Sequence, residues 1–285
     1  MQFMMLVKSD ERTEAGAMPD PAIIDAMTKY NEDLAKAGVL VSAEGLHPTS
    51  KGALLRLAGG KRATIDGPYA EAKEVIAGYW ILRTKTREEA IAWAKRNPGA
   101  AGNIELRQLY ETDDFPVDPA EQEDGWRAKE ERMRKEQEAA PKAAVKPGTK
   151  RFIAMLTSDK VTESGVLPDE KMLSAMGKLM EDMGSAGVIA GGEGLQPSAK
   201  GVRIKANKLT DGPFAESKEL IAGFMMLRCK SLAEAIEWSW RWLDVHCSGL
   251  QKDGEIQVRQ VFEMDELPPS EAVERAKKLT EQLGR

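Results

Sequence analysis

Residues 66–83 read DGPYAEAKEVIAGYWILR, and residues 211–228 read DGPFAESKELIAGFMMLR. Twelve of these eighteen positions are identical. Both stretches begin with an Asp-Gly-Pro turn sequence and end in an apolar run typical of a central strand. The chain therefore contains one strand-forming unit twice, at an offset of 145 residues.

Two further pairs of stretches lie in the same order along the chain. Residues 37–48 (AGVLVSAEGLHP) match residues 186–197 (AGVIAGGEGLQP) at seven of twelve positions, at an offset of 149. Residues 104–111 (IELRQLYE) match residues 256–263 (IQVRQVFE) at an offset of 152. Turns tolerate length changes, so these offsets predict a shorter hairpin in the second repeat and a longer loop after its second helix.

The repeats divide the 285-residue chain into four parts. We expect a first domain at residues 1–116, a charged helical linker at 117–149, a second domain at 150–267 and a C-terminal helix at 268–285. Each repeat has the pattern strand, helix, strand, hairpin, strand, helix, strand, which makes the fold class α+β.

This order predicts two tandem ferredoxin-like domains with extra hairpin strands, each an antiparallel sheet with both helices on one face. A lone repeat would leave the other, apolar sheet face in water, which costs about 25 cal/mol per Å². The repeats are therefore expected to pair through their sheets as an intrachain pseudo-dimeric α/β barrel. The sequence leaves open whether this pseudo-dimer associates further into a homo-oligomer.

Composition narrows the classes of partner. Lys and Arg total 41 against 46 Asp and Glu, a net charge of −5, which predicts no nucleic-acid and no membrane partner. No apolar run reaches the roughly 20 residues of a membrane span, and we expect a cytoplasmic protein. There is no phosphate-binding glycine loop or dinucleotide fingerprint, so no cofactor is expected.

The segments at Glu44-Gly45-Leu46, Asp66-Gly67-Pro68 and residues 104–107, in this order, resemble the YCII-related superfamily, and in particular its DGPF branch. The resemblance implies the dimeric α/β-barrel fold and a biochemical role that is generally unassigned, often beside extracytoplasmic-function sigma factors. In the wider group a His on the first helix has been proposed as catalytic. Residues 30–33 contain no His, so that proposal does not transfer.

The motif aspartates, Asp66 and Asp211, have two interpretations. A carboxylate at the mouth of a pocket can act as a base or anchor a ligand, whereas Asp before Gly-Pro also caps a turn. His47 can titrate near neutral pH, and Gln196, which replaces it in the second repeat, cannot. Any catalysis is therefore expected to use His47 with Asp66 nearby.

Glu44 and Glu193 end an otherwise small and apolar strand, where an unpaired charge is costly. Arg107 and Arg259, in the closing strands, are their expected partners, either as structural ion pairs or as ligand-binding groups. The predicted ligand-binding set is listed here: Glu44, Tyr69, Arg107, Glu193, Asp211 and Arg259.

Other residues are predicted to be structural. His246 and Cys247, with Cys229, lack the spacing of a zinc site, and no metal is expected. Trp238, Trp240 and Trp242 fit the buried face of a helix better than an aromatic ligand patch.

Two functions remain open. The first is binding or conversion of a small polar molecule in a pocket between sheet and hairpins. The alternative is a non-catalytic regulatory or protein-interaction module, in which the motif serves only the fold.

Overall fold

The computed structural model describes residues 1–68, 75–101, 103–115, 148–206, 208–214, 220–249 and 251–283. The linker predicted at residues 117–149 lies almost entirely outside these ranges. Among the described residues, no helix has the length and apolar character needed to cross a membrane.

The two repeats contain the same succession of strands and α-helices. In the first repeat these are β1 (Gln2–Lys8), α1 (Glu11–Glu14), α2 (Pro21–Lys36), β2 (Leu40–Gly45), η1 (Thr49–Lys51), β3 (Gly52–Ala58), β4 (Lys61–Asp66), β5 (Ile76–Arg83), α3 (Arg87–Lys95), η2 (Pro98–Ala101), β6 (Asn103–Gln108) and η3 (Thr112–Asp114). In the second repeat and tail they are β7 (Lys150–Thr157), α5 (Lys160–Glu163), α6 (Glu170–Ala186), β8 (Ile189–Gly194), η4 (Ser198–Lys200), β9 (Val202–Lys205), β10 (Lys208–Asp211), β11 (Ile221–Cys229), α7 (Leu232–Cys247), β12 (Gly254–Gln260), η6 (Met264–Glu266) and α8 (Glu271–Gln282).

Local signals explain where the helices begin. Asp20 accepts a hydrogen bond from a backbone N–H in the first turn of α2, and Asp169 does so for α6. Thr86 and Ser231 cap α3 and α7 in the same way. A side-chain oxygen at this position satisfies a backbone donor that has no partner within the helix, which fixes where each of these helices begins.

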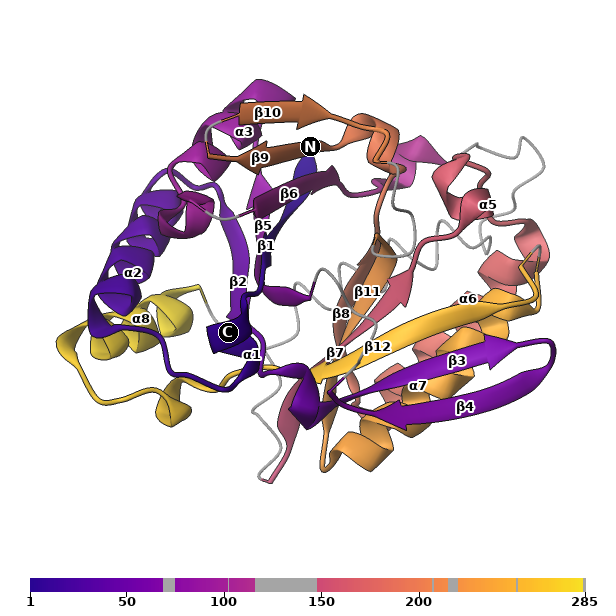
Figure 1. Ribbon diagram of the computed structural model, residues 1–285. Coiled ribbons are helices and arrows are strands. Elements are labelled where there is room, and N and C mark those ends of the chain that lie inside the picture. Colours follow the sequence, from indigo (N-terminus) through magenta and orange to yellow (C-terminus); the bar gives the residue numbers. More distant parts are fainter. Residues whose placement is uncertain are drawn as a thin grey trace.

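The hairpins are exchanged between the repeats. One sheet has the strand order β10-β9-β6-β1-β5-β2, and the other has β4-β3-β12-β7-β11-β8. The hairpin β3–β4 therefore extends the sheet of the second repeat, and β9–β10 extends the sheet of the first, as the colours in Figure 1 show. All these strand pairs are antiparallel, and in register Ile256 faces Leu55 while Ile104 faces Ile204.

The central strands are buried on both faces. In β1, Phe3 and Met5 pack into a cluster with residues of α2 and α3, whereas Met4 and Leu6 pack into a second cluster on the opposite face. This alternation follows from the two-residue period of a strand. Helices α2 and α3 lie on the outer face of one sheet, and α6 and α7 lie on that of the other (Figure 1).

The second cluster joins the inner faces of the two sheets. It includes Tyr79 from β5 and Phe224 from β11, whose ring centroids are 5.8 Å apart. The complete buried set is Met4, Leu6, Leu46, Ile76, Tyr79, Ile81, Leu109, Ile153, Met155, Leu195, Ile221, Phe224 and Val261. The apolar sheet faces are thus covered by each other, which is the burial requirement inferred from the sequence.

One length prediction was wrong. The second hairpin is shorter, as expected, but the seven extra residues after it lengthen a helix rather than a loop, because α7 has 16 residues and α3 has 9. The exchanged hairpin packs on this helix: the Trp240 indole donates to the Thr64 hydroxyl, and Asp244 in the added turns pairs with Arg62. Trp242 is buried in the core beneath.

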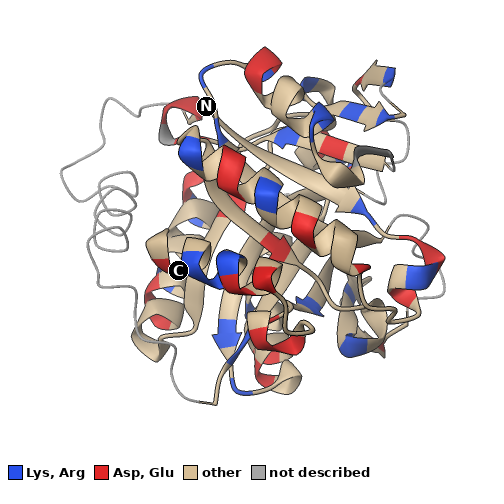
Figure 2. Ribbon diagram, turned by 90° about the vertical axis from the view of Figure 1, so that its left-hand side faces the viewer, with Lys and Arg blue, Asp and Glu red and all other residues tan. Residues whose placement is uncertain are grey.

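The C-terminal helix α8 packs on α2 of the first repeat. The Thr28 hydroxyl donates to the Ala272 carbonyl, and Arg275 pairs with Glu32 at 2.9 Å. Figure 2 shows acidic and basic residues mixed along the helices of this outer side. The tail of the second repeat therefore also holds the first repeat.

The exchange predicts that a hairpin side chain from one repeat stabilises the core of the other. Leu55 is fully buried in the cluster of the second repeat, so Leu55→Ala should lower the free energy of unfolding by about 2–5 kcal/mol. Leu209→Ala is the matched control, because Leu209 on the other hairpin is 40% exposed and should change stability by less than about 0.5 kcal/mol. Equal effects in denaturant titrations would contradict the exchanged packing.

Candidate functional site

The motif aspartates lie at the surface. Asp66 ends β4 and is exposed, and no polar contact joins it to His47 in the part of the chain that the structure describes. Asp211 ends β10, is exposed, and pairs with Arg87 at 2.5 Å. The two side chains therefore make no hydrogen bond or ion pair with each other, although Gly67 packs against the carbonyl of Thr49, two residues after His47.

The rest of the motif has a packing role. A Cβ atom on Gly67 would lie 1.7 Å from the Thr49 carbonyl oxygen, and one on Gly212 would lie 1.8 Å from that of Ser198. Only glycine permits this approach. Phe214 is buried, and its N–H donates to the Ser198 hydroxyl. Tyr69, at the equivalent position of the first repeat, lies outside the described residues.

Two fully buried arginines cross between the repeats. The Arg107 Nε and Nη2 groups donate to the Gln196 carbonyl at 3.2 and 2.6 Å. The Arg259 Nε group donates to the His47 carbonyl at 3.0 Å, and its Nη2 group donates to the same oxygen. Each arginine thus binds the residue that follows β2 or β8 of the opposite repeat.

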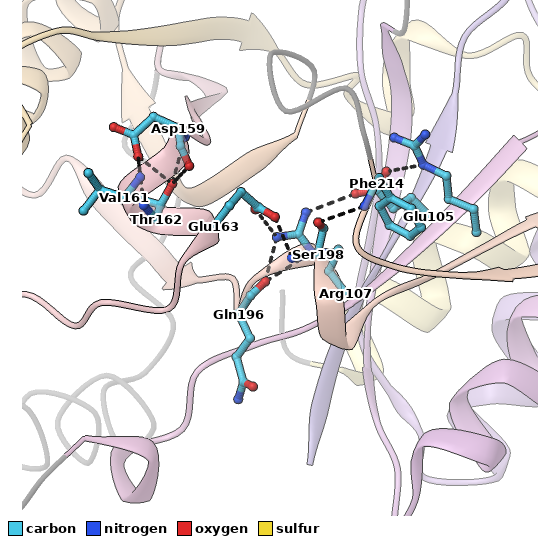
Figure 3. Close-up of polar contacts among 10 residues, drawn as sticks. Glu105, Arg107, Asp159, Val161, Thr162, Glu163, Gln196, Ser198 and Phe214 are labelled. Carbon is cyan, nitrogen blue, oxygen red and sulfur yellow. Dashed lines mark hydrogen bonds and ion pairs between the residues drawn. The ribbon is translucent and has the colours of Figure 1, made fainter.

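A glutamate completes each arrangement. Glu163 lies 3.3 Å from Arg107 and accepts from the Ser198 N–H at 2.9 Å. Its equivalent, Glu14, lies 3.6 Å from Arg259 and accepts from the Thr49 N–H at 3.1 Å. Figure 3 shows Arg107 directed toward both Glu163 and Gln196.

We name these groups by their central residues. The Gln196 cluster consists of Arg107, Asp114, Glu163, Gln196, Ser198 and Lys200. The His47 cluster consists of Glu14, His47, Thr49, Lys51, Arg259 and Glu266. Both clusters combine side chains of the two repeats at matching positions.

The clusters differ at their central side chains. Gln196 Nε2 donates to Asp114 at 2.8 Å, and its Oε1 accepts from Lys200 Nζ at 2.6 Å. In the other cluster, His47 Nε2 lies 2.9 Å from Glu266 Oε2. Only the second arrangement contains an imidazole, so only it can exchange a proton near neutral pH.

Burial controls the titration of His47. The residue is 3% exposed, and its ring lies 3.7 Å, centroid to centroid, from that of Phe262. Burial lowers the pKa of His47 below its ordinary value, and the hydrogen bond and charge of Glu266 oppose this shift. The folded protein therefore favours the neutral imidazole.

A pocket of about 360 Å³ opens beside the Gln196 cluster. Its polar walls are the side chains of Tyr110, Asp114, Glu163 and Lys200. Its remaining lining residues are Ser164, Gly165, Leu167, Pro197 and Ala199. Burial and the charge of Asp114 raise the pKa of Tyr110, so the phenol remains protonated at neutral pH and available as a donor.

The predicted Glu44–Arg107 pair is wrong. Glu44 accepts from Arg151 at 2.7 Å, while Arg107 contacts Glu105 on its own strand and Glu163 of its cluster. The reason is the strand order. Glu44 lies on β2 and Arg107 lies on β6, and strands β5 and β1 lie between them. Glu193 is half-buried on β8. This strand forms one edge of the second sheet, and the β3–β4 hairpin forms the opposite edge.

The residues that the sequence analysis missed are the acidic members of the clusters. Glu14 and Glu163 share the offset of 149, and Asp114 and Glu266 share the offset of 152. These repeated acids were a detectable signal. Their contacts with the opposite repeat were not, because those depend on the exchange of hairpins.

No metal centre is present among the described residues, where no group of three or more His, Cys, Asp or Glu side chains is arranged to hold an ion. Cys229 and Cys247 are buried free thiols. Burial raises their pKa values, to about 12 for Cys229 and about 11 for Cys247, so neither is a reactive thiolate.

Fold and clusters define an α+β protein whose candidate sites lie where two similar sequence units meet. The chain belongs to the YCII-related domain family, whose model matches residues 1–113 and 152–265. It is also similar to "Uncharacterized protein R00369" of Rhizobium meliloti (strain 1021), at 27% identity over 124 residues. That match covers 41% of this chain and 99% of the relative, so the relative is about one repeat long.

Replacing a buried arginine should lower the free energy of unfolding far more than replacing an exposed one. Arg107→Met leaves Glu105, which is 1% exposed, without its Arg107 contact and should lower the free energy of unfolding by about 3–5 kcal/mol. Arg96→Met breaks a pair with Asp33 in which both side chains are about half exposed and should cost about 1 kcal/mol or less. Similar losses for the two variants in urea titrations would refute this assignment.

Proposed function

We propose that this protein binds a small polar molecule in the pocket of the Gln196 cluster. The observation that carries the proposal is the pocket of about 360 Å³ at the junction of the repeats, with five polar residues in its lining. Concave sites with a few convergent polar groups are the usual form of small-molecule sites.

The free polar atoms of the pocket indicate the class of ligand. Among the described residues, the Tyr110 hydroxyl and Asp114 Oδ1 make no hydrogen bond, and Lys200 uses one of its three donors on Gln196. An ammonium and a phenol beside a carboxylate suit a molecule that carries both an acceptor and a donor group. Amino acids, amino alcohols and small hydroxy acids have this character.

Binding fits the lining better than turnover does. The polar lining comprises two carboxylates, an ammonium, a phenol and the Ser164 hydroxyl. Ser164 donates to the Val161 carbonyl, so the described lining includes no nucleophile paired with a base. His47 belongs to the other cluster, and Asp66 is exposed at the end of β4.

The proposal includes a finer reading of the fold. Two ferredoxin-like units of the DGPF branch, produced by tandem duplication, would form one pseudo-dimeric α/β barrel. Support comes from the shared core between the inner sheet faces, the two family matches and the DGPF sequence at residues 211–214.

A non-catalytic interaction module is the second candidate. It is favoured by the packing role of the motif glycines and by the contacts that Arg107 makes with protein groups. In that case the pocket would bind nothing, and the motif would serve only the fold.

A thermal-shift panel of amino acids, amino alcohols, hydroxy acids and dicarboxylates separates the candidates. A ligand at 100 times its Kd raises the free energy of unfolding by about 2.7 kcal/mol, which moves the melting temperature by several degrees. Tyr110→Phe and Lys200→Met should abolish the shift, because they remove free donors from the pocket.

The chain supplies matched controls. Lys51→Met changes the equivalent lysine of the His47 cluster and should leave the shift intact, as should Asp66→Asn at the exposed motif aspartate. If no member of the panel shifts the melting temperature, or if the pocket variants respond like wild type, the interaction module is the better description.

A further inference from the structure

The segment that follows β12 is held to the first repeat at three successive points. The Phe262 N–H donates to the Gly45 carbonyl at 2.9 Å, and the Phe262 ring lies against His47. Glu266 in η6 then contacts His47 Nε2, and α8 continues onto α2. His47 therefore contacts the segment just before the chain enters α8.

The Gln196 cluster provides a built-in comparison. Its Gln196–Asp114 hydrogen bond occupies the place of the His47–Glu266 contact, and Tyr110 occupies that of Phe262. Gln196 carries no titratable proton. The same geometry is thus insensitive to pH at one junction and sensitive to it at the other.

We propose that the His47–Glu266 contact is a proton-dependent clasp, which holds η6 and α8 on the first repeat while His47 is neutral and releases them when His47 is protonated. This regulation lies outside the proposed ligand pocket. Release uncovers Phe262, which stands where Tyr110 lines the pocket of the other cluster.

The charges around His47 decide the direction of the effect. Lys51 and Lys150 act on it from η1 and β7, and Arg259 binds its carbonyl from β12. Against these cations stand Glu266 and, through Arg259, Glu14. A proton on His47 adds a positive charge to a region that already holds three.

The balance of effects on His47 favours release over a tighter ion pair. The Glu266 side chain is 33% exposed, so solvent weakens its pairing with an imidazolium. Burial of the ring lowers the pKa of His47 by more than Glu266 raises it. Lifting the segment away returns the imidazolium to water and removes the cost of burying its charge.

The sign of the pH dependence follows from the lowered pKa of His47. In the unfolded or released chain, His47 binds a proton near the ordinary His pKa of about 6.5. In the clasped chain it binds a proton only at lower pH. The stability of the clasp is therefore complete above about pH 6.5 and declines as the pH falls toward the folded pKa.

Hydrogen exchange of the full-length protein at pH 7.5 and 5.5, corrected for intrinsic rates, tests the clasp. Amides of residues 263–283 should exchange about tenfold faster at pH 5.5, since one pKa unit changes an equilibrium tenfold. His47→Gln, which installs the residue of the other cluster, should remove this acceleration. His246→Gln is the control, because His246 lies in α7 of the second repeat and should leave it unchanged.

A second measurement keeps the proposal testable if His47→Gln folds poorly. The chain has two histidines, so their imidazole NMR signals can be titrated separately in the wild-type protein. The midpoint for His47 should coincide with that of the exchange acceleration. An unaccelerated wild type, an acceleration that survives in His47→Gln, or midpoints more than about one unit apart would overturn the clasp.

Discussion

Everything in this molecule depends on the exchange of hairpins between its two sheets. A β-sheet edge presents unpaired N–H and C=O groups, and an apolar sheet face requires a cover. Here β12 pairs with β3 from the first repeat, and β6 pairs with β9 from the second. The inner faces then cover each other over one shared cluster. Neither sheet is complete without strands from the other half of the chain.

The exchange also explains the two buried arginines. Each hairpin brings its 3₁₀ turn, and the carbonyl just before it, against the closing strand of the opposite repeat. Arg107 and Arg259 lie on those strands and donate to these carbonyls through Nε and Nη2. A planar guanidinium with fixed donors suits this two-bond contact, which a lysine ammonium cannot reproduce. The arginines therefore fasten the exchanged parts together and leave little capacity for a ligand.

The Gln196 cluster and the His47 cluster share nearly the same backbone arrangement but differ in their central side chains. The acids at Glu14 and Glu163, the arginines and the turns repeat closely, whereas the side chains between them diverge. Gln196 is bonded on both sides and stands beside an open pocket lined by Tyr110. His47 is packed on Phe262 and bound to Glu266. Divergence at a junction changes binding and titration without disturbing the fold, because the backbone contacts that hold the junction remain.

The amino-acid sequence alone determined the two repeats, the order of their elements and the need for each apolar sheet face to find a partner. These properties follow from local pattern and from side-chain type. It also singled out His47, Arg107 and Arg259 as unusual residues. It did not reveal that Asp66 is exposed, that Glu44 pairs with Arg151, or that seven extra residues extend α7. Those outcomes depend on which strands become neighbours, and only the tertiary structure decides this. Hydrogen bonds between strands from distant parts of the chain do not depend on any local sequence pattern, so the sequence cannot predict them.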